Sequence, residues 1–390
     1  MANDAACKVN QAAVVVALVA GTLGPAVLLI LPTFIGVLAR DYSLSDEQLG
    51  VFSFSNLGGL ALGSGVGASL FPKTGIRLTT GCGFVLAFAA NVAMVFARAY
   101  SALLMLSVVS GIGGGLAVAV CYAVLGRSKH VDRNFGIYVA CQVLFSALAI
   151  YSMPKVADLM GAPGIFGLMA ALLLLSLPLV GYLPPLRGAA LHDAAAGRIV
   201  RSVWVALCAV FAFFTAQGAV WTYLEIIGVR GGVDPQIVAN GLAIATLAGV
   251  LGPIISAGLG ARIGRALPLL VGVGLMIGAS QMISSPLGPF RFGLSACLFT
   301  IAWNLTIPYQ LSSISAVDQS GQAVAWAASI SLAGLALGPL TAAVVLSDLG
   351  LLGVVWLSAA LFIASFLGMI PVLHTAPPKR STKSAVVTTG

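Results

Sequence analysis

The sequence predicts an all-α integral membrane protein with twelve transmembrane helices in two parallel six-helix halves around a central cavity. Three observations predict this fold class: an apolar composition, twelve apolar runs long enough to cross a bilayer, and a basic turn that occurs twice. The chain of 390 residues is 59% hydrophobic and only 8% charged, with a mean hydropathy of +1.07. An ordinary soluble domain has about 25% charged residues, so this composition excludes a water-soluble fold.

The predicted elements are the apolar runs themselves. A spanning helix needs about 20 mostly apolar residues to cross about 30 Å of hydrocarbon, because lipid offers an open backbone no hydrogen-bond partner. The first run lacks the pattern of a signal peptide, so we expect it to be retained as a span. In chain order the runs cover residues 12–38, 47–71, 76–97, 101–125, 134–156, 163–183, 201–228, 236–260, 265–284, 290–315, 320–346 and 350–373.

The basic residues divide unequally between the two sides of the membrane that these runs define. Fourteen of the 19 Lys and Arg residues fall on the side of the two termini, and five fall on the other side: Arg40, Arg98, Lys155, Arg230 and Arg291. Because cytoplasmic loops carry the excess of positive charge, we expect a multi-pass protein of the inner (plasma) membrane with both termini in the cytoplasm. The net charge of +8 then fits contact with anionic lipid, and no nucleic-acid partner is expected.

A short basic turn recurs half a chain apart. The first copy reads ASLFPKTGIR and the second reads AGLGARIGRA, with Gly75 and Gly264 standing 189 positions apart. Six predicted spans separate the copies, so both lie on the same side of the membrane and the two halves are parallel repeats. We therefore expect an N-terminal six-helix half at 1–183, a cytoplasmic linker at 184–200, a C-terminal six-helix half at 201–373 and a cytoplasmic tail at 374–390.

The span count, the loop order and the paired turn make the chain resemble the major facilitator superfamily. The signature of that family is a cytoplasmic turn between spans 2 and 3, G-x-x-x-D-[RK]-x-G-[RK]-[RK], which is echoed between spans 8 and 9. The resemblance implies transport by alternating access, with the turns acting in gating. Pro72 and Ala261 replace the Asp that the family is thought to use in a charged latch, so we expect a weaker or differently built inner latch. The residues that match the turns are Lys73, Gly75, Arg77, Arg262, Gly264 and Arg265.

The usual ion-pair routes for proton coupling in that family are not visible in this chain. Ser107 precedes the glycine-rich stretch of span 4, where an Arg is common, and span 1 carries no acid. A carboxylate within a span is costly in hydrocarbon and is a functional candidate by default. Glu225 ends a stripe with Gln217 and Trp221 on one face of span 7. We expect Glu225 to carry the coupling proton; the alternative is an interfacial acid that pairs with Arg230 or is simply hydrated.

Aromatic and amide side chains within the spans predict a pocket for an organic solute. Aromatic residues near span ends have an alternative role as interface anchors. No Lys or Arg lies near the middle of a span, so a multiply charged anion would lack a bidentate partner there. We expect a small amphipathic organic solute, such as an aromatic or other monocarboxylate. The residues expected to contact it are Tyr122, Tyr138, Gln142, Gln217, Trp221, Trp303, Asn304, Gln310 and Trp326.

These observations predict a secondary active transporter that works by proton-coupled uptake and functions as a monomer. The alternative is proton-linked efflux of drugs or metabolites. An integral-membrane enzyme would need catalytic side chains at suitable spacing and a receptor would need a further domain, and neither pattern is present. The six cysteines and three histidines form no CxxC or His/Cys cluster, so we expect no disulfide framework, no metal and no cofactor.

Overall fold

The computed structural model describes residues 10–125, 128, 131–183, 200–259, 262–283, 288–317 and 322–373, and every regular element in these ranges is helical. Residues 184–199 of the expected linker and the whole expected tail lie outside the described part. In chain order the elements are α1 (Gln11–Leu23), α2 (Ala26–Tyr42), α3 (Asp46–Thr74), α4 (Ile76–Phe96), α5 (Tyr100–Leu125), α6 (Val131–Ser176), the 3₁₀ helix η1 (Leu177–Tyr182), α7 (Arg201–Arg230), α8 (Pro235–Ala248), α9 (Leu251–Leu259), α10 (Ala266–Met282), α11 (Pro289–Val317) and α12 (Gln322–Leu373).

Nine segments of the described chain are long and apolar enough to cross a membrane. Two of them are much longer than one crossing requires, and each contains a glycine with non-helical backbone, Gly161 (φ 64°) in α6 and Gly350 (φ 65°) in α12. The apolar helix α10 adds a shorter segment of 17 residues. The helical membrane class is thus confirmed, while the number of twelve spans stays a prediction.

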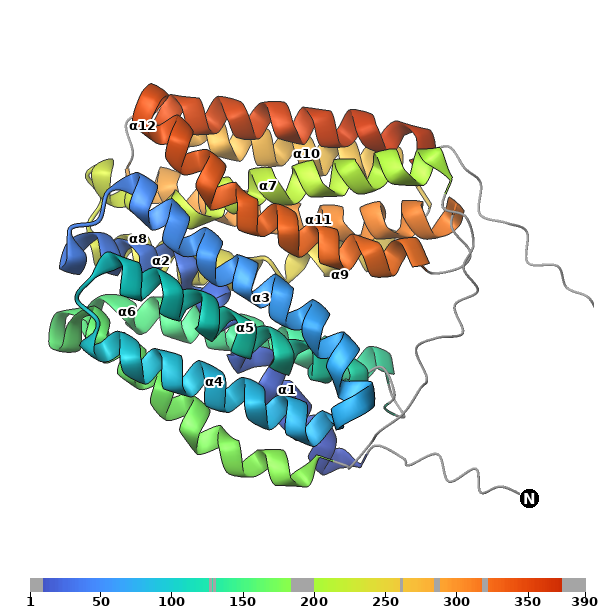
Figure 1. Cartoon of the computed structure of the whole chain (residues 1–390). Helices are drawn as coiled ribbons and strands as arrows, with labels where there is room; N and C mark the ends of the chain where they lie inside the picture. Colours follow the sequence, from blue (N-terminus) through green and yellow to red (C-terminus); the bar gives the residue numbers. More distant parts are fainter. Residues whose placement is uncertain are drawn as a thin grey trace, which may run out of the picture.

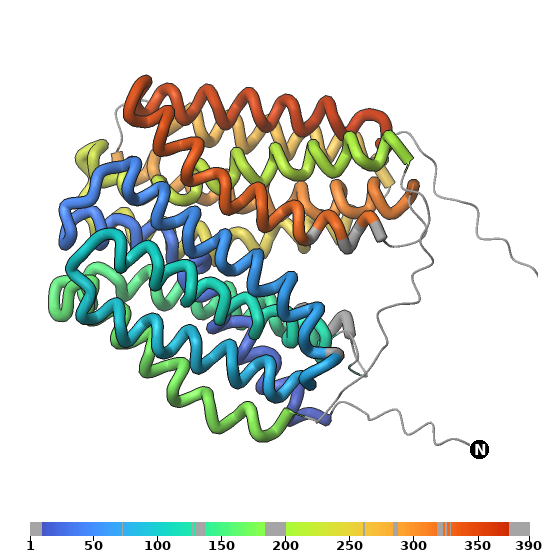
Figure 2. The backbone as a smooth tube through the Cα atoms, viewed as in Figure 1, coloured from blue at the N-terminus to red at the C-terminus, as the bar shows by residue number. Residues whose placement is uncertain are grey.

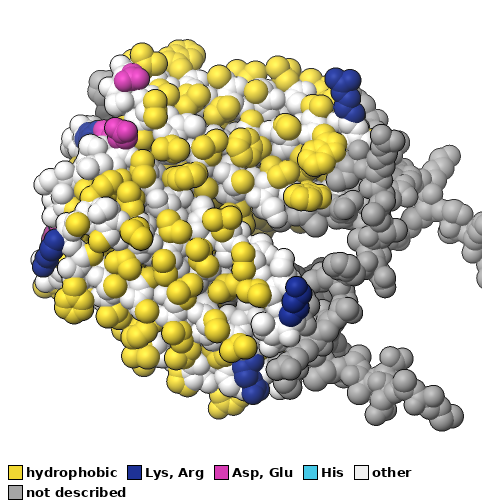
Figure 3. All heavy atoms as spheres, in the orientation of Figure 1, with side chains coloured by type: hydrophobic (Ala, Val, Ile, Leu, Met, Phe, Trp, Pro, Cys, Tyr) yellow, Lys and Arg dark blue, Asp and Glu magenta, His cyan; other side chains and the backbone are white. Residues whose placement is uncertain are grey.

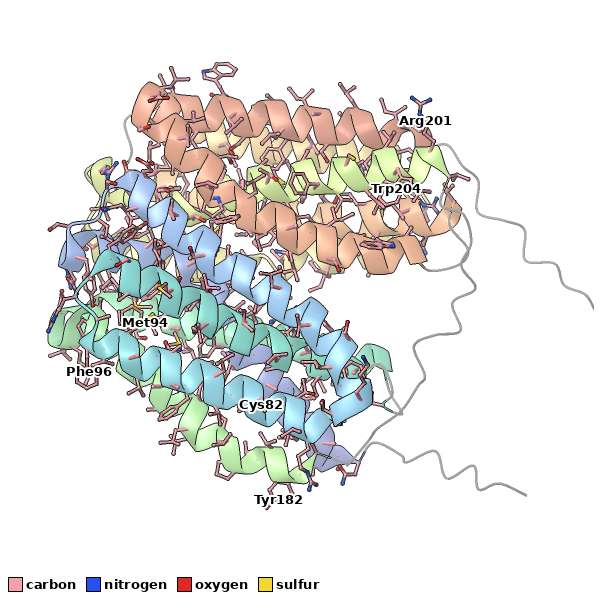
Figure 4. The ribbon with its side chains drawn as sticks, in the orientation of Figure 1. Cys82, Met94, Phe96, Tyr182, Arg201 and Trp204 are labelled. Atoms are coloured by element: carbon pink, nitrogen blue, oxygen red, sulfur yellow. The ribbon has the colours of Figure 1, made fainter. Side chains whose placement is uncertain are left out.

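The helices form two groups that follow the chain. Figures 1 and 2 show α1–α6, coloured blue to green, beside α7–α12, coloured yellow-green to red, with the start of α1 and the end of α12 both on the right. We call the end that carries Gly75, Leu183 and Arg201 the linker end. The opposite end, which carries Arg40 and Arg230, is called the far end. Figure 4 labels Arg201 and Trp204 at the linker end of α7, and Phe96 at the far end of α4.

The hydrophobic cores differ between the two ends. One large cluster of buried side chains takes residues from both groups, among them Phe34 of α2 and Phe213 of α7, and extends to the far end. Toward the linker end, one cluster belongs only to the first group and includes Phe84, whereas a separate cluster belongs only to the second group and includes Leu207. The two groups therefore share a core at the far end and have separate cores at the linker end.

The outer surface carries the pattern that a bilayer requires. Figure 3 shows hydrophobic side chains over the middle of the visible face, with Lys, Arg, Asp and Glu gathered near its two ends. Apart from Asp132 at the start of α6, the side chain of which is not described, the acidic residues of the described ranges belong to the far end or its approach: Asp41, Asp46, Glu47, Asp158, Glu225, Asp234 and Asp348.

Left-handed backbone positions repeat with a single offset along the chain. Every described residue with positive φ has a counterpart 189 positions away. The offset is that of the two basic turns, so the repeat seen in the sequence also exists in the backbone. The N-cap residues of α3 and α8, Ser45 and Asp234, are separated by the same offset, so the repeat extends to the starts of these two helices. The pairs are Ser43 (φ 52°) with Gly232 (φ 88°), Gly75 (φ 93°) with Gly264 (φ 74°), and Gly161 (φ 64°) with Gly350 (φ 65°).

Candidate functional site

Hydrogen bonds and an ion pair connect the two groups of helices at the far end. The guanidinium of Arg230 in α7 donates two hydrogen bonds, 2.8 and 2.6 Å long, to the carboxylate of Asp46 in the first turn of α3. The buried hydroxyl of Tyr223 donates to the Asp46 carbonyl at 2.8 Å. A third link runs from the Gln236 amide of α8 to the Tyr151 carbonyl of α6, at 3.1 Å. These contacts close the far end.

A second ion-pair network lies within the first group. Arg40 of α2 donates to Asp41 and to Asp158 of α6, each at 2.8 Å. The other oxygen of the Asp41 carboxylate accepts a 2.6 Å hydrogen bond from the backbone N–H of Ala162, next to the break at Gly161. The network fastens the end of α2 to the bend of α6.

A cavity of about 500 Å³ opens at the far end between the two groups. Its rim is exposed to solvent, since the side chains of Arg40 and Asp158 are 51% and 71% exposed. Both groups contribute to its wall, and Glu225 is the only expected site residue among its lining residues. The lining residues are Thr33, Gly36, Val37, Ala39, Arg40, Met153, Pro154, Ala157, Asp158, Glu225, Ile226, Val229, Arg230, Asp234, Pro235 and Gln236.

Glu225 has no hydrogen-bond or ion-pair partner among the described residues. Arg230, which the sequence offered as a possible partner, binds Asp46 instead. Arg40 lines the same cavity but is bound to the carboxylates of Asp41 and Asp158. The interpretation of Glu225 as half of an Arg230 ion pair is therefore wrong, and its carboxyl group is left to interact with whatever enters the cavity.

Three expected substrate-binding residues come together on α7 and α11. The rings of Trp221 and Trp303 lie 6.0 Å apart, centroid to centroid, at 57°. Gln217, one turn from Trp221, is fully buried, yet neither atom of its amide group has a hydrogen-bond partner among the described residues. The indole N–H of Trp303 is also buried and has no partner in the described part of the chain. Buried polar atoms are nearly always satisfied, so these three atoms are the most evident places for a ligand to bind.

Three other expected residues form a second cluster in the first group. The rings of Tyr122 and Tyr138 meet edge to face at 5.7 Å. The Gln142 amide donates to the Tyr138 hydroxyl at 2.8 Å and to the Gly21 carbonyl at 3.1 Å, which connects α6 to α1. Tyr122 is 47% exposed, so this cluster reaches an open surface.

No hydrogen bond between described residues joins the last three expected substrate contacts to either cluster. The Asn304 amide donates to the Thr300 carbonyl of its own helix at 2.9 Å. The Gln310 amide donates to the Ser365 hydroxyl at 3.4 Å, between α11 and α12. Trp326 is 48% exposed. The described residues therefore form two separate clusters, and the expectation of one common pocket stays a prediction.

The glycines of the paired turns at the linker end have left-handed backbone. Gly75 and Gly264 both have positive φ, which other residues adopt only at a cost. Arg77 donates from Nε and from one terminal nitrogen to the Leu183 carbonyl, at 3.1 and 2.7 Å, and so ties the first turn to the end of η1. Lys73 and Arg262 are exposed and Arg265 immediately precedes α10. Ala261 and the side chain of Pro72 lie outside the described part, so the expected inner latch stays a prediction.

Sequence reasoning missed the residues that close the far end. Asp46 was not singled out, although Ser45 and Gln48 around it form a capping box that marks the start of α3. Gly36 was also missed, and its number differs from that of Glu225 by 189, the offset of the repeated turns. Applying this offset to Glu225 would have identified Gly36 from the sequence.

Comparison with known proteins places this architecture in a family. The model of the Major Facilitator Superfamily matches residues 12–317. A mutant of the nucleoside transporter NupG has a similar structure, with a TM-score of 0.75, 10% identity, and coverage of 93% of this chain and 98% of that one. A D-xylose–proton symporter also has a TM-score of 0.75, with 15% identity and coverage of 94% and 98%. No curated protein sequence matches. The extent of the family match shows that this chain belongs to the Major Facilitator Superfamily.

Proposed function

We propose that the protein is a proton-coupled secondary transporter that takes up a small amphipathic organic solute by alternating access. The shared core at the far end carries this proposal, because it stands beside two separate cores at the linker end. Two groups joined at one end and separate at the other are what a carrier with one closed gate requires. Family membership supports transport over catalysis, and the similar D-xylose–proton symporter supports symport.

The orientation of the chain follows from its basic residues. The linker end carries Lys73, Arg77 and Arg201, whereas every acidic residue whose side chain the structure describes lies toward the far end. With the basic end in the cytoplasm, both termini lie inside and the closed far end faces outward. The conformation is then open to the cytoplasm and closed to the outside.

The central substrate site is proposed at Trp221, Trp303 and Gln217. Two indole rings offer apolar faces, while the unpaired amide and indole N–H offer one acceptor and three donor hydrogens. An aromatic or other monocarboxylate fits this set if its carboxylate accepts from those donors, since no described Lys or Arg lies beside them. A thermal-shift screen of organic acids, aromatics, sugars and cationic drugs would identify the ligand class.

Coupling is proposed to depend on protonation of the Glu225 carboxyl group. The charged groups that share its cavity are Arg40 of α2, Asp158 of α6, Arg230 of α7 and Asp234 at the start of α8. A carboxyl group without an ion-pair partner can bind and release a proton without breaking a salt bridge. In proteoliposomes, Glu225→Gln should bind the solute identified by the screen but should lose the acceleration of uptake by an inward proton gradient.

Asp348→Asn provides the matched control for this experiment. Asp348 is also an acid on the far-end approach, but among the described residues its side chain accepts a hydrogen bond only from the neighbouring hydroxyl of Ser347. The control should keep the proton dependence of the unmodified protein. Unchanged proton dependence in Glu225→Gln would show that the coupling site lies elsewhere.

A further inference from the structure

Gly36 of α2 lies directly against the carboxyl group of Glu225 in α7. A Cβ atom added at Gly36 would have the two carboxylate oxygens and the carboxyl carbon of Glu225 as its three nearest neighbours, all closer than non-bonded atoms approach one another. Each of these atoms belongs to the same side-chain end. Any side chain at position 36 would therefore displace this carboxyl group.

The two positions are equivalents in the internal repeat. Their numbers differ by 189, as do those of every pair of described residues with positive φ. Two equivalent residues can touch each other only close to the axis that relates the repeats. The contact between Gly36 and Glu225 therefore marks the point near the far end where α2 and α7 meet across that axis.

The other charged groups around this contact are already engaged. Arg40 binds Asp41 and Asp158, and Arg230 binds Asp46. The carboxylate of Asp234 accepts hydrogen bonds from the first N–H groups of α8. Gly36 therefore contributes space for the Glu225 carboxyl group, and no described cation holds that group in place.

We propose that Gly36 is the positioning residue for Glu225, so that one repeat supplies the acid and the equivalent position of the other supplies the space for it. The proposal rests on the coupling role proposed for Glu225. The contact exists while α2 and α7 meet at the closed far end. Opening the far end separates the two helices, which ends the packed contact with Gly36 and leaves the carboxyl group in the cavity alone, so its protonation is tied to the conformation.

The first test is Gly36→Ala, studied in the full-length protein in proteoliposomes. Alanine is the better helix former, so a loss of function would not come from helix propensity. Overpacking against the carboxyl group should lower the rate of proton-driven uptake about tenfold and flatten its pH profile. Gly274→Ala in α10 is the matched control, because a Cβ there meets no atom of the described residues within 4 Å. It should behave as the unmodified protein.

The second test restores the space from the other side. Glu225→Asp removes one methylene group and withdraws the carboxyl group from α2, so adding it to Gly36→Ala should recover most of the lost uptake and the pH profile. If Gly36→Ala lowers the yield of folded protein, the thermal unfolding temperatures of the variants can be compared in place of their uptake rates. The Gly36→Ala/Glu225→Gly variant should recover the unfolding temperature because the overlapping group is gone.

The third test exchanges the two residues between the repeats. If the positions are equivalent, Gly36→Glu/Glu225→Gly places a carboxyl group from α2 against bare backbone of α7. This double variant should exceed both single variants in uptake and should regain a pH response.

The proposal is overturned if Gly36→Ala retains the uptake and pH profile of the unmodified protein. It is equally overturned if neither Glu225→Asp nor the exchange improves on the single variants. Failure of the coupling role itself gives a different result, because Glu225→Gln alone would then keep its proton dependence.

Discussion

The guanidinium of Arg230 binds the carboxylate of Asp46 through two hydrogen bonds that cross between residues 184 positions apart in the chain. The pair joins α7 to α3 at the far end, and the Tyr223 hydroxyl reinforces it by donating to the Asp46 carbonyl. The Arg230 side chain is 58% exposed, whereas that of Asp46 is 20% exposed. The pair is thus a solvent-accessible latch between the two groups.

Removing this latch should favour opening of the far end. An exposed ion pair contributes about 1 kcal/mol or less, so Asp46→Asn should shift the ratio of closed to open forms by about fivefold at most. Spin-label distances across the far end, measured at low and high salt, would report the shift. Salt should have a smaller effect on the variant than on the unmodified protein. A ratio that is unchanged at low salt would show that the latch contributes nothing to closure.

Packing at Gly50 should contribute more to closure than the ion pair does. A Cβ at this position of α3 would meet the Cβ of Ala343, and would lie 2.7 Å from both the Pro339 carbonyl oxygen and the Tyr223 hydroxyl oxygen. Gly50→Ala should therefore destabilise the closed far end by about 1–3 kcal/mol.

Gly58 provides the control for that variant within the same helix. A Cβ at Gly58 would meet no described atom within 4 Å, so Gly58→Ala should leave the far-end distances unchanged. Labelling of a cysteine introduced at Val37, in the far-end cavity, would measure opening of this end independently. Equal labelling in the two alanine variants would contradict the steric argument.

The buried amide of Gln217 predicts opposite effects on stability and on binding. Neither of its polar atoms has a partner within the part of the chain that the structure describes, so Gln217→Leu should stabilise the ligand-free protein by about 1–3 kcal/mol. The same change removes hydrogen-bonding groups that a substrate would use, and affinity should fall at least about tenfold. Thermal unfolding and equilibrium binding on the same preparation would check the two signs.

Gln142→Leu is the matched comparison, because the Gln142 amide donates to the Tyr138 hydroxyl and the Gly21 carbonyl. Losing these bonds should destabilise the protein by about 1 kcal/mol. If Gln217→Leu is instead destabilised by as much as Gln142→Leu, the Gln217 amide has a partner in solution and is not a free ligand contact.

The membrane class and the internal repeat could both be predicted from the sequence. The first depends on the apolar composition, and the second depends on the spacing of two similar turns. Gly75 and Gly264 needed no structure to be recognised as a pair, since a tight turn at equal spacing selects glycine in both places. The partner of Arg230 could not be predicted in this way. Whether it binds Glu225, five positions away, or Asp46, in another helix, depends on how the two groups close, which local patterns do not encode.

The candidate site shows the same limit. Helical spacing placed Gln217, Trp221 and Glu225 on one face of α7, but it does not say what that face meets at each level. Trp221 meets Trp303 of α11, whereas Glu225 meets Gly36 of α2. Residues on one face of α7 therefore contribute to two separate regions, the central aromatic pair and the far-end cavity.

Alanine substitutions at Gly161 and Gly350 would separate two contributions to stability at the bends of α6 and α12. One is the strain of the backbone conformation, and the other is the steric overlap of an added side chain. Both glycines have a backbone conformation that is favourable only for glycine, with φ 64°, ψ −172° and φ 65°, ψ −162°. Within the described ranges, a Cβ at Gly350 meets no atom within 4 Å, so Gly350→Ala should cost only the conformational strain, about 1–3 kcal/mol. A Cβ at Gly161 would lie 2.9 Å from Oδ2 of Asp41, the oxygen that accepts from the Ala162 N–H. Gly161→Ala should therefore be the more destabilising of the two, because it also disturbs the network of Arg40. Thermal unfolding of both variants would show which of them is less stable. Adding Asp41→Ala to each variant should reduce the difference between their unfolding temperatures. If the difference persists, the additional destabilisation by Gly161→Ala does not come from the network of Arg40.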